Sequence, residues 1–160
     1  MRLPTTPSLV VLSLPLLSLA QTYPTDLIGT WSTKSNSTLT GPGFYDPLNE
    51  KLIEPTHTGI SYSFASSGHY EEAYYRAVAN PQNPSCPSGI MQWQHGSWTF
   101  NANGSLSMAP IEVDGRQLLS TPCSFKNSVY TRYNQTELFM VGRHFPSLTS
   151  HFRLSCDWDE

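Results

Sequence analysis

Alternation of apolar and polar residues is the main pattern in this chain. Residues 60–64 alternate large apolar side chains with serine, which is typical of a strand with one buried face. Residues 65–68 are typical of a turn, and an aromatic-rich strand over residues 69–78 returns from it. We therefore predict a β-hairpin, in which Glu71 and Glu72 place one side of the second strand in water.

The strand predicted next changes its phase. Met91 and Trp93 are odd-numbered, whereas Trp98 and Phe100 are even-numbered. Because side chains alternate with a period of two, these four cannot share one face of a regular strand. Two explanations stay open: a β-bulge at residues 96–97 restores the phase, or protein covers both faces of the strand.

Turn signals divide the rest of the chain into short strands. Asn103-Gly104 is the strongest of them and favours a type I′ hairpin turn. The sequence contains no convincing amphipathic helix and no repeat. We therefore predict a mainly β protein, an antiparallel up-and-down meander that closes into a single lipocalin-like β-barrel, because closure removes the unpaired edges of a meander.

The first predicted strand leads into a loop with two aromatic residues. Gly29 and Trp31 form a Gly-x-Trp motif similar to the opening of lipocalin-like barrels, although a core tryptophan explains it more simply. In the loop over residues 41–47, glycine and proline restrict the backbone around Phe44 and Tyr45. These two side chains are candidate contact residues, and packing inside the barrel is the alternative.

The N-terminus has the pattern of a signal peptide. Arg2 precedes an apolar run over residues 9–19, which is too short to span a bilayer comfortably, and Ser18 and Ala20 suit a cleavage site. We expect removal of residues 1–20, with an uncleaved anchor as the alternative. Charged residues make up 13% of the chain and the net charge is −3, so a basic footprint for nucleic acid is absent.

Entry into the secretory pathway permits disulfides and N-glycosylation. Cys86 and Cys123 each lie beside a proline and are our preferred disulfide pair, although three cysteines allow three single pairings and Cys156 is left over. Acceptor sequons for N-glycosylation begin at Asn36, Asn103 and Asn134.

Candidate chemistry is sparse. The histidines lack the spacing of metal ligands, and the sequence has no nucleophile motif and no phosphate-binding loop. Glu112 and Asp114 would share one face of a strand as a carboxylate pair, but a solvated edge with Arg116 as partner explains them better. We therefore expect a protein that is not an enzyme and that needs no cofactor and no metal.

Seven distinctive segments follow one another in order along the chain: TGPGFYDP (40–47), LIEP (52–55), SYSF (61–64), NPQNPSCP (80–87), QHG (94–96), PIEVDGRQL (110–118) and RYNQTE (132–137). Together they resemble the fungal Rot family, named for reversal of Tor lethality. The resemblance covers residues 27–137.

The resemblance implies a chaperone of the endoplasmic reticulum lumen. Such proteins assist the folding of secretory and cell-wall proteins and support β-1,6-glucan and cell-wall assembly. Family members are glycosylated, and a single C-terminal segment of type I topology, which we do not find in this sequence, anchors them in the membrane. Unfolded secretory proteins would be the partners, with Phe44 and Tyr45 as the candidate client-contact loop. A small-ligand or glycan-binding barrel without catalysis is the alternative function.

The resemblance also divides the chain. We expect a signal peptide over residues 1–20, a lumenal β-barrel domain over residues 21–137 and an irregular tail over residues 138–160 that departs from the family pattern. Our hypothesis is that a truncated or mis-spliced gene model produces this tail. It leaves open whether the barrel closes.

Overall fold

The computed structural model describes residues 23–140, and this part of the chain is almost entirely antiparallel β-sheet. A 3₁₀ turn, η1 (Thr25–Leu27), precedes the first strand, and no α-helix occurs within these residues. The prediction of a mainly β protein is therefore confirmed. The strands are β1 (Gly29–Ser32), β2 (Tyr45–Asp46), β3 (Lys51–Leu52), β4 (Gly59–Phe64), β5 (His69–Val78), β6 (Ser88–Phe100), β7 (Ser105–Pro110), β8 (Arg116–Ser120), β9 (Val129–Arg132) and β10 (Glu137–Met140).

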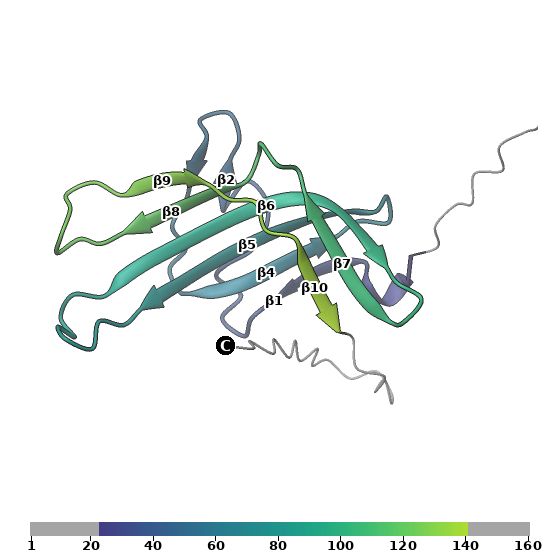
Figure 1. Cartoon of the computed structure of the whole chain (residues 1–160), viewed down its shortest axis with the longest axis horizontal. Coiled ribbons are helices and arrows are strands. Elements are labelled where there is room, and N and C mark those ends of the chain that lie inside the picture. The colour runs from purple at the N-terminus through teal and green to yellow at the C-terminus, as the bar shows by residue number, and fades with distance from the viewer. Residues whose placement is uncertain (1–22, 141–160) are drawn as a thin grey trace, which may run out of the picture.

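The main sheet is organised along β6, its longest strand. The strand order is β1-β4-β5-β6-β7-β10, and every pairing is antiparallel. Residues 96–100 of β6 pair with β7, whereas residues 89–93 pair with β8. As a result β7 and β8 lie end to end along one edge of β6, and β10 and β9 pair with them in the same way (Figure 1).

β1 and β10 stand at opposite ends of the strand order and form separate edges of the main sheet. β1 pairs with β4 and β10 pairs with β7, and no pairing joins β1 to β10 between residues 23 and 140. The predicted antiparallel pairing is thus confirmed, but the order is not a simple up-and-down meander, because β8 returns to pair with β6 and β10 returns to pair with β7. The sheet is not closed into a barrel within the part of the chain that the structure describes.

Both faces of β6 are covered by apolar side chains. Trp98 belongs to one core cluster, whereas Met91 and Trp93 belong to a second cluster on the opposite face. Pairing of β6 with β5 continues without interruption from residue 88 to residue 97, so β6 has no bulge at residues 96–97. The bulge explanation is wrong, and the alternative, protein on both faces of the strand, is confirmed.

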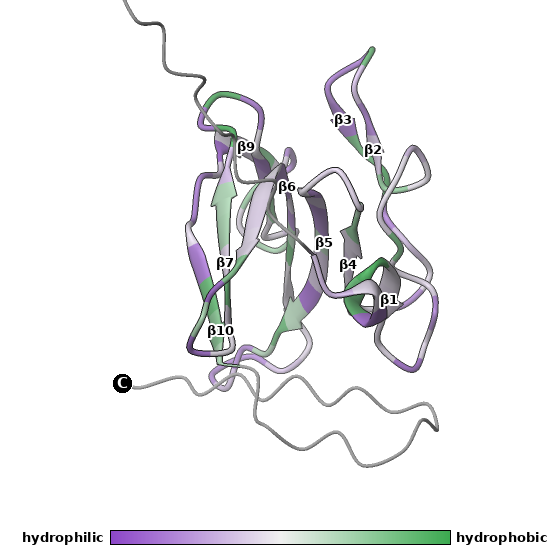
Figure 2. Cartoon of the chain, turned by 90° about the vertical axis from the view of Figure 1, so that its right-hand side faces the viewer, coloured by the Kyte–Doolittle hydropathy of each residue, from purple (hydrophilic) through white to green (hydrophobic). Residues whose placement is uncertain are grey.

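The second face is covered by the segment between β1 and β4, which carries the β2–β3 hairpin on one side of the sheet (Figure 2). Phe44 and Tyr45 are 1% and 5% exposed and pack with Leu52 against Trp93. The rings of Tyr45 and Trp93 stack with their centroids 3.9 Å apart. The packing alternative for this loop is therefore confirmed. The expectation that Phe44 and Tyr45 form a client-contact surface is wrong for this fold, because both side chains lie in the core.

The hairpin between β6 and β7 has a different turn from the one predicted. Gly104 has a φ of 84°, but Asn103 is not in the left-handed region, as a type I′ turn would require. The Asn101 N–H donates to the Ser105 carbonyl at 2.8 Å, and the Gly104 N–H donates to the Asn101 carbonyl at 2.9 Å. This is a three-residue loop with glycine at its left-handed position.

A disulfide joins Cys86 to Cys123, which is the pair preferred from the sequence. It links the loop after β5 to the loop after β8 across 37 residues, a loop length worth about 4 kcal/mol in the chain-entropy account. Cys156 and the expected signal peptide lie outside the described residues. Most of the expected tail also lies outside them, but residues 138–140 belong to β10 and are not irregular.

The burial of Phe44 gives a direct test of how this loop packs. Phe44→Ala should lower the free energy of unfolding by about 3–4 kcal/mol, because it empties a filled site in the core. Leu48→Ala in the same segment should change it by less than about 0.5 kcal/mol, because Leu48 is 93% exposed. Urea unfolding followed by tryptophan fluorescence measures both, and equal effects of the two substitutions would contradict this packing.

Candidate functional site

Two carboxyl groups meet on one face of the sheet, one of them buried (Glu72) and the other partly exposed (Glu137). Glu72 comes from β5 and Glu137 from the edge strand β10. Gln94 of β6 lies between them, and its Nε2 donates to Glu72 Oε2 at 2.7 Å and to Glu137 Oε1 at 3.3 Å. Tyr62 of β4 donates its hydroxyl to Glu137 Oε2 at 3.0 Å. Side chains from four strands therefore meet in one hydrogen-bonded network.

The amide of Gln94 also holds the segment that leads into β10. Its Nε2 donates to the Gln135 carbonyl at 3.0 Å, and its Oε1 accepts the Gln135 N–H at 3.1 Å. Gln94 is fully buried, so these bonds satisfy an amide that water does not reach. One side chain of β6 thus fixes both the backbone before β10 and the first side chain of β10.

Burial controls the charge of the pair. Desolvation, with the nearby charge of Glu137 as the next cause, raises the pKa of Glu72 to about 9. Desolvation also raises the pKa of Glu137, although its hydrogen bonds to Glu72, Tyr62 and Gln94 oppose this rise. At neutral pH the two carboxyl groups therefore retain a proton between them.

Tyrosines surround the carboxyl pair. Burial and the two carboxyl groups raise the pKa values of the hydroxyls of Tyr62, Tyr70 and Tyr133, so all three stay protonated. Tyr70 is buried, and its hydroxyl makes no hydrogen bond within the described residues. Because Glu72 is only 1% exposed, an external substrate does not reach its carboxyl group, whereas Glu137 is partly exposed.

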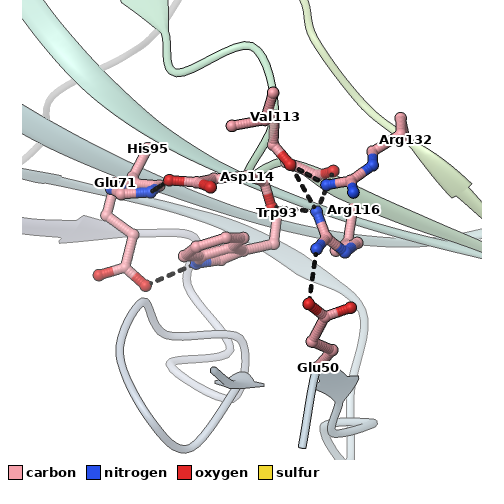
Figure 3. A network of polar contacts seen from close by, with 9 residues as sticks. Glu50, Glu71, Trp93, His95, Val113, Asp114, Arg116 and Arg132 are labelled. Carbon is pink, nitrogen blue, oxygen red and sulfur yellow. Dashed lines mark hydrogen bonds and ion pairs between the residues drawn. The ribbon is translucent and has the colours of Figure 1, made fainter. Parts of the chain in front are cut away.

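A second polar arrangement lies on the opposite face, beside a hollow of about 580 Å³. The ring of Trp93 stacks on Tyr45 at 3.9 Å and on His95 at 4.9 Å between centroids. Glu71 Oε1 accepts the Trp93 indole N–H at 2.7 Å and the Gly41 backbone N–H at 2.9 Å (Figure 3). Glu71 therefore joins the covering loop to the sheet at the margin of the hollow.

The segment between β7 and β8 closes the other side of this arrangement. Asp114 Oδ2 lies 2.9 Å from His95 Nε2, and both side chains are partly exposed. Arg116 and Arg132 both donate to the Val113 carbonyl (Figure 3). These contacts hold the segment between β7 and β8 in place. They give the partly exposed His95–Asp114 pair a structural role.

The carboxylates considered from the sequence do not form a pair. Glu112 is exposed, whereas Asp114 is engaged with His95. Arg116, which the sequence suggested as their partner, instead forms an ion pair with Glu50 at 3.2 Å. In residues 23–140 no group of three or more His, Cys, Asp or Glu side chains could hold a metal ion.

The three glycosylation acceptors lie at the surface. Asn36 is in the loop after β1, Asn103 in the turn before β7, and Asn134 between β9 and β10. All three are exposed, as an acceptor must be. Their use as glycosylation sites stays a prediction.

Sequence reasoning missed the carboxyl pair, although one part of it left a signal. Glu72 has the same strand phase as Tyr70 and Tyr74, which places it on the aromatic face, yet we expected it to face water. That expectation is wrong, because strands on both sides of β5 and the network around Gln94 bury Glu72. The position of Glu137 depends on the pairing of β10 with β7, which no local pattern indicates.

Comparison with known proteins identifies the family. Residues 27–150 match the Rot1 family, described as a fungal chaperone for protein folding within the endoplasmic reticulum. A protein of Aspergillus oryzae named "Protein rot1" is 67% identical over 118 residues, covering 74% of this chain and 51% of that protein. The protein of the same name from Botryotinia fuckeliana is 62% identical over 133 residues, covering 82% of this chain and 50% of that protein. No solved structure matches the chain.

The extent of these matches corrects one boundary. The family match continues past Glu137 to residue 150, and β10 itself reaches Met140, so the family pattern does not stop at Glu137. The chain spans about half the length of the curated relatives it matches. Within residues 23–140 no helix is long and apolar enough to cross a membrane. The chain belongs to the Rot1 family of fungal proteins.

Proposed function

We propose that this chain is a non-enzymatic chaperone that assists protein folding in the lumen of the endoplasmic reticulum. Its membership of the Rot1 family, whose description names this activity, is the observation that carries the proposal. The described residues are consistent with binding, because the carboxyl group of Glu72 is buried and Asp114 is held by His95.

A chaperone of this kind needs exposed apolar side chains that tolerate different partners. Because Phe44 and Tyr45 are buried, we place this contact surface elsewhere. Phe125 is 64% exposed in the loop before β9, and Leu138 and Met140 are 62% and 69% exposed on β10. Val113, Val129 and Tyr130 add exposed apolar side chains near β8 and β9.

The edge of β10 offers a second kind of contact. β10 pairs with β7 on one side, and its other side is an edge of the sheet in the described part of the chain. A sheet edge can accept an extended polypeptide through backbone hydrogen bonds. We therefore propose that unfolded segments of clients bind along β10. A lipocalin-like barrel stays part of the proposal only if strands formed by residues outside 23–140 complete the sheet between β10 and β1.

The finer features of the function rest on the family resemblance alone. We propose that the clients are secretory and cell-wall proteins and that support of β-1,6-glucan assembly is an indirect result of their folding. Attachment to the membrane by a C-terminal segment, as in the family, belongs to the same proposal.

The hollow on the second face favours one other candidate function, the binding of a small ligand. Its lining combines Tyr45, Trp93 and His95 with the carboxylate of Glu71. Such a mixture of rings and polar groups suits a small molecule with apolar and polar parts. A lipid extract and a glucan array are suitable probes, and absence of binding to both would remove this candidate.

The contact surface can be tested by making it polar. The double variant Leu138→Ser, Met140→Ser should suppress the aggregation of a denatured client several-fold less than the unchanged chain, because it removes exposed apolar area without touching the core. Light scattering measures aggregation, and circular dichroism confirms that the variant is folded. The same suppression by a folded double variant would exclude β10 as the contact surface.

The absence of catalysis can be tested separately. The double variant Glu112→Gln, Asp114→Asn should suppress client aggregation as well as the unchanged chain, because binding of an unfolded client requires no acid or base. The same light-scattering assay measures the result. Loss of function in this double variant, with its fold intact, would return the carboxylates to consideration as functional groups.

A further inference from the structure

We propose that Glu72 and Glu137 form a protonation-controlled latch that holds the edge strand β10 in the sheet. While the pair retains its proton, Gln94 and Tyr62 bind both carboxyl groups and β10 stays in place. When the proton is lost, β10 leaves the sheet so that Glu137, which is partly exposed in the closed state, becomes fully hydrated. This inference concerns the fold itself and does not depend on the proposed chaperone activity.

Two ionised carboxylates side by side are strongly disfavoured in this environment, in which Glu72 is buried and Glu137 is only partly exposed. Glu72 is buried, and the described contacts place no cation between it and Glu137, whereas the Gln94 amide supplies two neutral hydrogen bonds. Removing a carboxylate from water without a counter-charge costs several kcal/mol. Loss of the shared proton must therefore be relieved either by taking up a proton again or by moving one carboxylate into solvent.

The structure decides which carboxylate moves. Glu72 is in the middle of β5, a strand of ten residues paired on both sides by β4 and β6. Glu137 is the first residue of β10, a strand of four residues that, among residues 23–140, pairs with β7 alone. Opening the sheet at β10 breaks fewer backbone hydrogen bonds than opening it at β5. Local opening takes place first where few bonds hold a segment, so β10 is the element that moves.

The network also defines how much of the chain would move. Gln135 is bound through its backbone to Gln94, and that bond depends on the same amide that donates to Glu72 and Glu137. Turning this amide away from the carboxyl pair would therefore loosen residues 135–140 together. The moving unit is β10 with the two residues before it.

Every element around the pair contributes a group that titrates outside the neutral range or does not titrate. Tyr62 from β4, Tyr70 from β5 and Tyr133 from the segment before β10 stay protonated, because burial raises the pKa of each hydroxyl. On β6 the facing group is the neutral Gln94, and β7 contributes the apolar Met108, whose backbone pairs with Glu137.

On β5, two further groups, Tyr74 and Arg76, lie further along the same face. Arg76 is exposed, packs over the Tyr74 ring at 5.6 Å, and lowers the pKa of Tyr133.

The direction of the pH dependence follows from burial. In the folded protein the pKa of Glu72 is raised to about 9, whereas an unfolded or released glutamate titrates near its ordinary value of 4.5. A raised pKa means that the contribution of the pair to stability is complete below that ordinary value and is lost as pH rises through the folded value. The latch is thus closed in acid and opens progressively towards alkaline pH.

Hydrogen exchange of the full chain provides the test. The protection factor of the β10 amides should fall as pH rises from 6 to 9, approaching a limit of about tenfold per pH unit, while the β5 amides keep their protection. Glu72→Gln should abolish most of this dependence, because glutamine has the size of a protonated glutamate, still donates to Glu137 and cannot ionise. The matched control is Glu112→Gln, which removes an exposed carboxylate and should leave the dependence unchanged.

Each outcome decides the matter. An equal pH dependence of β10 protection in Glu72→Gln and in the unchanged chain would overturn the latch. Parallel loss of protection in β5 and β10 would also overturn it, because the whole domain would then be opening. If Glu72→Gln fails to fold, Glu137→Gln serves the comparison, because it removes the carboxylate that β10 carries. Burial still raises the pKa of Glu72 in that variant, so the expected result is that β10 protection depends on pH no more steeply than β5 protection. A steeper dependence of β10 than of β5 in Glu137→Gln would count against the proposal.

Discussion

Coverage of β6 on both faces and along both edges is the constraint on which the rest of the structure depends. β5 pairs with one edge over ten residue pairs, and β7 and β8 divide the other edge between them. Trp98 packs into one core cluster, while Trp93 packs into the other. Five of the 13 residues of β6 are buried, and a buried polar side chain in such a strand must find a partner within the protein.

The need for hydrogen-bond partners is greatest for Gln94, because its side-chain amide is fully buried in the middle of β6. Its amide is satisfied by two carboxyl groups and by the backbone of Gln135. The same network specifies the register of β10. A slip by one residue would bring Leu138 in place of Glu137 to the amide, and it would leave buried polar groups without partners. An apolar contact at this point would tolerate such a slip more easily, so the polar centre contributes specificity as well as cohesion.

The parts of the fold that local patterns determine were predictable. The alternation over residues 60–64 and the turn after it gave the β4–β5 hairpin, and the change of phase along β6 correctly limited the choice to two explanations. The glycine- and proline-rich loop around Phe44 was misjudged, because its composition resembles that of an exposed loop. Whether it folds back depends on a distant surface, the apolar odd-numbered face of β5 and β6, which needs a cover. The carboxyl pair was missed for the same reason: its two members meet only through the register of β10 on β7.

The inward direction of Glu137 also bears on how an exposed sheet edge can persist without pairing to another chain. Edge strands with outward apolar side chains, such as Leu138 and Met140 on β10, invite pairing with other chains. Charged residues that point inward are one way in which natural sheets discourage such pairing, because an incoming strand would have to preserve or replace the partners of the buried group. Here the partners of Glu137 are already supplied by β4, β5 and β6. While they hold it, β10 stays short and aligned on β7. Glu137 therefore has two effects on this edge. Its contacts keep β10 ordered, and loss of the shared proton makes β10 easier to release.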